Sequence, residues 1–307
     1  KWKDIKMSKT RLLAEQPIIS LLGKELYFAL PGDEASIKSR EEMTAMVEAS
    51  LFDMEKDPSN PVHYGCAGFH TWSLNDLQGS LAIFDKGTEN CPDSHELYWL
   101  KTLLKTTMRD LPGAIADAEC AVALIKDKPD HGFDMRIFMY PDPRRYYPSS
   151  VHYVIWYHLG MAYYLNGELE KAKDAYIKSG EFIYGNSSLI SRSCWFYPVL
   201  RELGEHDQAE ALMVDIDDDI RVLADPSYKE QSLLFKGTLS IEDIQAKTDN
   251  EGNLNIAHEY AIAYWHYTHG DVDKAKVLFE RVCARPEIGI YVMIAAEAKL
   301  KELLSTQ

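Results

Sequence analysis

Apolar residues recur along this chain with the spacing of amphipathic helices, and the helices recur in pairs. Residues 156 to 176, WYHLGMAYYLNGELEKAKDAY, place Gly160 and Tyr163 on one apolar stripe and Ala172 on a second one after Gly167. Stripes with this period indicate helices that bury one face. A glycine between them is typical of a residue with positive φ that ends the first helix. The segment predicts a helix, a tight turn and a second helix.

The same pattern returns about every 34 residues. Ser80 and Ala114, small residues at which two helices must cross, lie 34 residues apart, and Ala172 follows Ala114 by 58 residues, which is one repeat plus an insertion. Ala209 and Ala275 occupy the same position in later copies. A single helical pair cannot bury its apolar faces, so this self-similarity predicts a stacked array of helical hairpins.

These repeats resemble the tetratricopeptide repeat (TPR) family over roughly residues 43 to 304. The order of LLGKELY, the repeats, a Pro-rich insert, WYHLG and IAAEAKLKELL is also similar to a bacterial group of such proteins. The resemblance implies an all-α fold, a right-handed superhelical solenoid of TPR-like hairpins with a C-terminal capping helix. It implies no known activity. The match is strong at 151–184 and 255–287, moderate at 62–127 and degenerate at 188–216, where Tyr197 replaces a small residue.

Each repeat of a solenoid contacts only its neighbours, so such an array grows without a domain break. We therefore expect a single domain over residues 37–304, after an N-terminal extension of residues 1–36. The expected elements of this domain are repeats at about 62–95, 96–127, 151–184, 188–220 and 255–287, an insert at 128–150 and a capping helix at 290–304.

The first helix of each pair in such a stack lines the concave surface, so groove residues recur at helical spacing along the first helices. Trp and Tyr supply rigid contact area with a polar tip and dominate binding hot spots. The alternative is that these aromatic residues pack as core, although a Tyr hydroxyl is costly to bury without a partner. The projected groove residues are Phe69, Trp72, Trp99, Tyr157, Met161, Tyr164, Arg201, Tyr260, Tyr264 and Tyr267, with Gly65, Leu103 and Cys194 on the same stripes.

The insert at 128–150 is longer than most connections inside a compact array. Its aromatic residues argue against disorder, and Arg136, Arg144 and Arg145 concentrate positive charge in an acidic chain. We predict an ordered loop that folds over the groove near Tyr157 as a lid or a plug. The alternative is a loop that covers part of the convex surface.

The net charge of −15 repels phosphate backbones, so no nucleic-acid partner is expected. No apolar run approaches the ~18 residues that span a membrane, so no membrane span is expected. The exception to the acidic character is the N-terminal KWKDIKMSKTR, which is an end left by processing, a remnant of protein expression or a short flexible arm. The compartment stays open between the cytoplasm and export after removal of a signal.

Sequence motifs for catalysis and metal binding are missing. There is no GxxxxGK[ST], GxGxxG, GxSxG or HExxH, and the ten histidines match no zinc spacing. The acidic run at 215–219 lacks the layout of a calcium loop, and the five cysteines form no CxxC pair. We therefore predict no catalytic residue, no metal and no cofactor.

Two hypotheses about function follow. The first is a non-enzymatic interaction scaffold that binds a peptide or protein segment in an aromatic-lined concave groove, where Arg201 can pair with a carboxylate. The second is a small-molecule-binding protein or enzyme whose groove pocket is closed by the insert, with Tyr157, His158 and Tyr264 positioned on the substrate. An open channel favours the first hypothesis. A deep, enclosed pocket with a buried His or Glu within hydrogen-bond reach of a Tyr favours the second.

Overall fold

The computed structural model describes residues 17–28, 32–133, 138, 149–222, 226–248 and 254–305. The regular secondary structure of the described part is almost entirely helical, which confirms the predicted all-α array of helical hairpins. The basic N-terminal segment lies outside the described residues, as do Arg136, Arg144 and Arg145 of the insert.

Most of the helices follow one another with short connections, and two small antiparallel strand pairs accompany them in the described residues. β1 (Ile18–Ile19) pairs with β2 (Glu25–Leu26) ahead of the array, and β3 (Gly132–Phe133) pairs with β4 (Ser149–Ser150) at the two ends of the insert. The helices are α1 (Glu34–Lys56), α2 (Pro61–Ser73), α3 (Leu77–Asn90), α4 (His95–Thr107), α5 (Leu111–Ile125), α6 (Val151–Leu165), α7 (Leu169–Gly180), α8 (Gly185–Glu202), α9 (His206–Ala211), α10 (Ser227–Lys236), α11 (Ile241–Gln245), α12 (Ile256–Thr268), α13 (Val272–Cys283) and α14 (Tyr291–Ser305).

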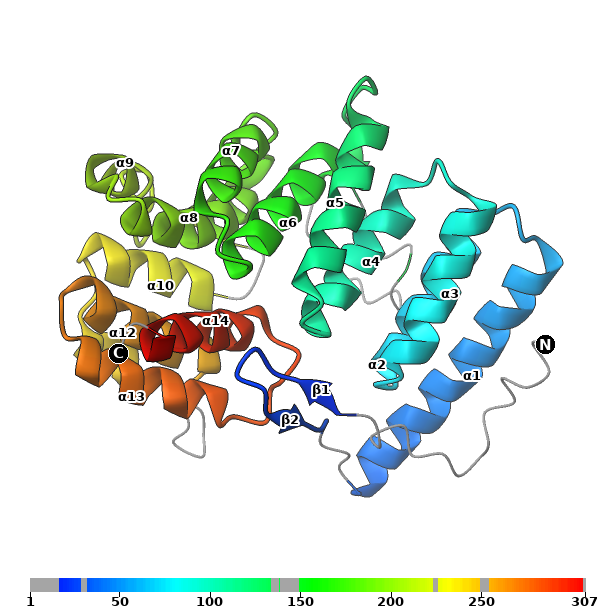
Figure 1. Ribbon diagram of the computed structural model, residues 1–307, viewed down its shortest axis with the longest axis horizontal. Helices are drawn as coiled ribbons and strands as arrows, with labels where there is room; N and C mark the ends of the chain where they lie inside the picture. Colours follow the sequence, from blue (N-terminus) through cyan, green and yellow to red (C-terminus); the bar gives the residue numbers. More distant parts are fainter. Residues whose placement is uncertain are drawn as a thin grey trace.

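Neighbouring helices pack as successive hairpins, most extensively in α6–α7 and α4–α5, and Figure 1 shows the hairpins side by side along a curved array. The first helices also contact one another, α2 with α4, α4 with α6 and α6 with α8. We call the side of the array formed by α2, α4, α6, α8 and α12 the inner face. Helices α10 and α11, which the repeat pattern did not predict, separate α9 from the last hairpin.

Local sequence explains where the first helices end. Gly167, Gly204 and Gly270 follow α6, α8 and α12 and have φ of 80°, 77° and 83°. This left-handed conformation costs little for glycine because it has no Cβ. The predicted turn chemistry is confirmed at these three positions.

The crossing of α6 and α7 depends on a residue without a side chain. A Cβ atom built on Gly160 would lie 3.2 Å from ring atoms of Tyr176. We expect Gly160→Leu to lower the free energy of unfolding by about 1 to 3 kcal/mol, because the added side chain overpacks this contact. Urea denaturation measures the loss, and Val277→Leu on the exposed side of α13 is the control. Equal stability of the two variants would show that the helices do not cross at Gly160.

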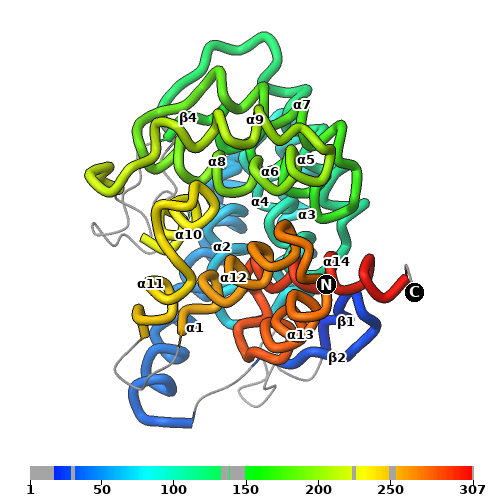
Figure 2. Tube along the Cα trace, turned by 90° about the vertical axis from the view of Figure 1, so that its left-hand side faces the viewer, coloured from blue at the N-terminus to red at the C-terminus, as the bar shows by residue number. Residues whose placement is uncertain are grey.

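The C-terminal end of the array curves back toward the middle of the array. In Figure 1, α14 lies beside α6 and α12, and it contacts both. The view at right angles in Figure 2 shows β1 and β2 next to α13 and α14. The backbone N–H of Leu21, in the turn between β1 and β2, donates to Oε2 of Glu297 in α14 at 2.9 Å. The N-terminal β-hairpin is thus hydrogen-bonded to the C-terminal helix.

Candidate functional site

Most of the projected groove residues are buried in the inner face. Six of the ten expose 7% or less of their surface, and several stack on one another: Tyr260 lies 6.1 Å from Tyr264 and 6.3 Å from Trp195, measured between ring centroids. In place of the open aromatic groove expected from the sequence, the structure has a filled one. The six buried residues are Trp99, Tyr157, Met161, Tyr164, Tyr260 and Tyr264.

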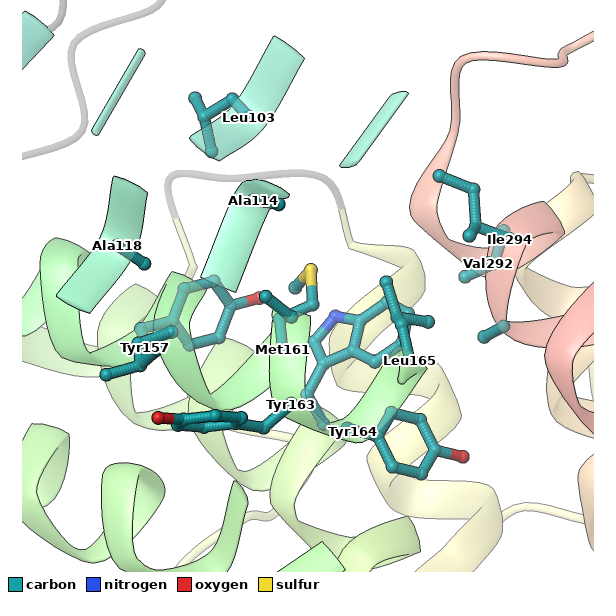
Figure 3. Close-up of a cluster of buried hydrophobic side chains, with 14 of the residues drawn as sticks. Leu103, Ala114, Ala118, Tyr157, Met161, Tyr163, Tyr164, Leu165, Val292 and Ile294 are labelled. Atoms are coloured by element: carbon teal, nitrogen blue, oxygen red, sulfur yellow. The ribbon is translucent and has the colours of Figure 1, made fainter. Parts of the chain in front are cut away.

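Helix α14 is one reason for this burial. Figure 3 shows side chains of α6 lying between small residues of α5 and the apolar residues of α14. In that view Tyr157, Met161 and Leu165 extend from α6, with Ala114 and Ala118 on one side and Val292 and Ile294 on the other. Tyr157 itself packs against the rings of Tyr153, His158 and Tyr176.

Phe138 is the residue between 134 and 148 that the structure describes. It is buried, and a Cβ atom on Gly65 of α2 would lie only 2.3 Å from its ring. Leu100 of α4 approaches the same point on Gly65 at 3.4 Å. The insert therefore contacts the inner face at α2 and α4. That it works as a lid or a plug stays a prediction.

The other four projected residues keep some exposed surface. Phe69 and Trp72 pack edge to face on α2, with ring centroids 6.0 Å apart. Arg201 was expected to be available for a carboxylate, but its Nη2 donates to the carbonyl oxygen of Thr268 at 3.4 Å. Tyr267 is half-buried, with Nζ of Lys299 4.8 Å above its ring. Whether any of these residues contacts a ligand stays a prediction.

A buried polar cluster forms where α6, α8, α12 and α14 meet. Oε1 of Glu202 accepts hydrogen bonds from the hydroxyls of Tyr164 and Tyr264, both at 3.2 Å. Its Oε2 lies 2.8 Å from Nζ of Lys299. Burial raises the pKa of Glu202 although Lys299 opposes the shift. Burial also disfavours the charged Lys299, but its ion pairs with Glu202 and Glu302 raise its pKa above the ordinary value.

A half-open pocket of about 570 Å³ lies beside this cluster, and we call it the rim pocket. It lies at the ends of α6, α8 and α12 and at the starts of α5 and α7, along the exposed part of α14. Aliphatic walls from Leu21, Leu111, Leu165 and Leu169 face a polar edge formed mainly by α14. The lining residues are Leu21, Leu111, Tyr164, Leu165, Asn166, Gly167, Leu169, Glu202, Tyr267, Ala298, Lys299, Lys301, Glu302 and Ser305.

Two of the ten projected residues, Tyr164 and Tyr267, line the rim pocket. The sequence analysis missed several of the others because it projected first helices only. Leu21 comes from the N-terminal extension, Leu169 from a second helix, and Lys299 from the capping helix. Glu202 directly follows the projected Arg201, but a carboxylate at the end of a helix gives no sequence signal that it is buried.

The burial of His158 on α6 predicts that the stability of the protein depends on pH. Its Nδ1 lies 2.6 Å from the carbonyl oxygen of Val154 and 3.1 Å from Nε1 of Trp99, and burial lowers its pKa from 6.5 to about 4. The folded protein therefore favours the neutral ring. The contribution of neutral His158 to the free energy of unfolding is complete above pH 6.5 and is lost as the pH falls toward 4.

We expect His158 to contribute on the order of 2 to 3 kcal/mol to the acid sensitivity, since one pKa unit corresponds to about 1.4 kcal/mol. Comparing the free energies of unfolding of wild type and His158→Phe between pH 4 and pH 7 measures this. As the pH falls, the free energy of unfolding of the wild type should decrease relative to that of His158→Phe. Parallel pH profiles would show that the ring titrates normally.

The described residues hold few other groups suited to metal binding or catalysis. No three His, Cys, Asp or Glu side chains among them are placed to hold a metal ion. The five cysteines are free thiols, and burial raises the pKa of the Cys194 thiol. None of the helices described combines the length and apolar composition needed to cross a bilayer.

Solved structures of TPR proteins are similar to this chain. A TPR protein from Parabacteroides merdae shares 15% identity at a TM-score of 0.49, over 87% of this chain and 95% of that one. YrrB, a TPR protein with an unusual peptide-binding site, shares 15% at a TM-score of 0.43, over 82% and 98%. PilW, a widely conserved type IV pilus biogenesis factor, shares 14% at a TM-score of 0.45, over 87% and 91%.

No protein-family model matches the sequence, and no curated protein matches it either. At these identities and TM-scores, we draw no conclusion from the likeness, and the fold rests on the chain's own helices. That fold is the TPR-like array of helical hairpins that the order and packing of the helices already describe.

Proposed function

We propose that this chain is a non-enzymatic interaction scaffold that binds a peptide or protein segment at the rim pocket. The observation that supports this most directly is the make-up of the pocket. Partly exposed aliphatic side chains such as Leu21 and Leu169 lie opposite exposed polar groups such as Lys301 and Glu302. An apolar wall with a few polar groups at its edge suits an apolar side chain on a polar backbone.

The second hypothesis, which includes an enzyme, predicts a buried His or Glu within hydrogen-bond reach of a Tyr. Glu202 is such a residue, because it accepts hydrogen bonds from two tyrosines. Its carboxylate is already occupied, because one oxygen accepts from Tyr164 and Tyr264 and the other pairs with Lys299. The pocket is also half-open rather than enclosed. These two observations favour a binding role for the pocket, with Glu202 as an anchor for the helices around it.

A peptide selection tests the proposal. A library of random peptides is selected on the full chain, and the affinities of enriched peptides are then measured for Leu169→Glu. Leu169 is the first residue of α7, where a carboxylate is compatible with the helix dipole. We expect a loss of affinity of about tenfold or more, because the new charge lies on the apolar wall of the pocket.

The matched control is Val277→Glu, which introduces the same charge at an exposed position of α13 outside the pocket. Its affinity for the selected peptides should equal that of wild type. Failure to enrich any peptide, or equal binding by Leu169→Glu and Val277→Glu, would refute a peptide site at the rim pocket. Native mass spectrometry of the purified protein detects a retained small molecule, which would support the alternative hypothesis.

A further inference from the structure

A second half-open pocket lies at the opposite end of α12 from the rim pocket. Its volume is about 570 Å³, and it shares no lining residue with the rim pocket. Its walls come from the start of α10 at Ser227, the start of α12 at Asn255 and Ile256, and the α13–α14 connection at Arg285 and Glu287. We call it the second pocket. A space of this size accommodates a small organic molecule.

The lining of the second pocket includes a buried side chain with an unpaired polar atom. His258 on α12 exposes 4% of its surface, and its Nδ1 has no hydrogen-bond partner among the described residues. Its Nε2 lies 2.7 Å from Oε2 of Glu230 on α10. Because a carboxylate only accepts, Nε2 carries the proton and Nδ1 of the neutral ring is an acceptor. A buried acceptor without a partner is unfavourable, so an N–H donor on a ligand would stabilise His258.

The charged side chains that line the second pocket are balanced. Oε1 of Glu230 lies 3.0 Å from Nζ of Lys247, and Arg285 donates two hydrogen bonds to Glu287, at 2.6 and 3.2 Å. Two cations thus line the pocket together with two carboxylates, in a chain whose net charge is −15. Complementary charge across an interface favours specific binding. This balance suits a ligand with one charge of each sign better than a plain anion or cation.

The second pocket also offers an open cation and an apolar wall. The side chain of Lys247 is 40% exposed, and its ammonium has further N–H donors beyond the one that faces Glu230. Leu254, Ile256 and Ile290 line the same space, and Ile290 is 42% exposed. An apolar lining with a few polar groups is the usual make-up of a small-molecule site.

We propose that the second pocket binds a free α-amino acid with an apolar side chain. The carboxylate of the amino acid pairs with Lys247, and its ammonium donates to Nδ1 of His258. Its side chain packs on Leu254, Ile256 and Ile290. Both charged groups of the ligand take part, which distinguishes a free amino acid from either end of a peptide. This goes beyond the proposed function, because a peptide at the rim pocket contacts none of these residues.

Ligand-observed NMR on the full chain tests the proposal with L-leucine and L-phenylalanine. Each amino acid is compared with its N-acetyl derivative, which has no ammonium, and with its amide, which has no carboxylate. We expect each amino acid to bind at least about tenfold more tightly than either analogue, because each analogue loses a charged hydrogen bond. No binding of the two amino acids, or equal binding of an analogue, would overturn the proposal.

Two variants test the two contacts separately. Lys247→Met should lower the affinity for each amino acid to that of its amide, because the cation that pairs with the carboxylate is gone. His258→Phe should lower it to that of the N-acetyl derivative, because the acceptor for the ammonium is gone. Circular dichroism shows which variants fold, and Lys247→Met carries the comparison if His258→Phe does not fold.

The matched control is Lys301→Met, which removes an exposed cation from the rim pocket. It should leave the affinities for the amino acids and their analogues unchanged. An equal loss in Lys301→Met, or a folded Lys247→Met that still prefers each amino acid to its amide by tenfold, would contradict binding at the second pocket. None of these outcomes affects the peptides selected at the rim pocket, whose test is Leu169→Glu.

Discussion

Tyr264→Ala is expected to destabilise the protein by about 3 to 5 kcal/mol, the range for removing a fully buried aromatic ring. Tyr264 is 0% exposed and packs against Tyr260, Phe235 and Tyr267. Its hydroxyl also donates to Glu202, so the substitution removes a hydrogen bond from a buried carboxylate. Urea denaturation of wild type and variant measures the loss.

Tyr184→Ala is the matched control, because Tyr184 is 59% exposed. Its effect should stay within about 0.5 kcal/mol. A Tyr264→Ala variant as stable as this control would mean that the ring faces an open groove, as the sequence alone suggested. That result would contradict the burial of Tyr264 in the inner face.

Arg109→Ala is expected to cost a similar amount, about 3 to 5 kcal/mol, because it leaves the buried Glu297 without its cation. Arg109 is held at four points: its Nε and Nη2 donate to Glu297, and its Nη1 donates to the carbonyl oxygens of Thr107 and Ile288, both at 2.7 Å. These bonds join the α4–α5 turn to the C-terminal part of the chain. Thermal and urea unfolding measure the loss.

Lys178→Ala provides the control for this pair, since Lys178 and Glu181 form an exposed ion pair. Such surface pairs contribute about 0 to 1 kcal/mol. The double variant Arg109→Met with Glu297→Met should recover most of the stability, because it removes both buried charges at once. If Arg109→Ala costs no more than Lys178→Ala, this pair does not hold the α4–α5 turn to α14.

The hairpins were predictable because their signals are local. A glycine with positive φ, such as Gly167, must follow its helix directly in the sequence, and a small residue such as Gly160 must face its partner within one hairpin. The period of about 34 residues then places the hairpins in order. Helices α10 and α11 escaped prediction because they depart from that period.

The candidate site was only partly predictable, because helical periodicity tells which side of a helix turns inward and not what fills the space. Tyr260 and Tyr264 do stack on one another, but whether they meet solvent depends on Trp195 of α8 and Phe235 of α10, which are 65 and 29 residues away in the sequence. Within IAAEAKLKELL, Glu297 and Lys299 look like solvent-exposed positions. Their burial depends on Arg109 and Glu202, which are 188 and 97 residues away in the sequence.

The most direct test of the central claim is a methyl NMR titration of the full chain with a peptide selected from the random library. A peptide at the rim pocket should shift the methyl signals of Leu21, Leu165 and Leu169 while leaving those of Ile177 and Val277, on exposed second-helix surfaces, unchanged. Shifts confined to Ile177 and Val277, with the three leucines unaffected, would contradict the proposed binding site.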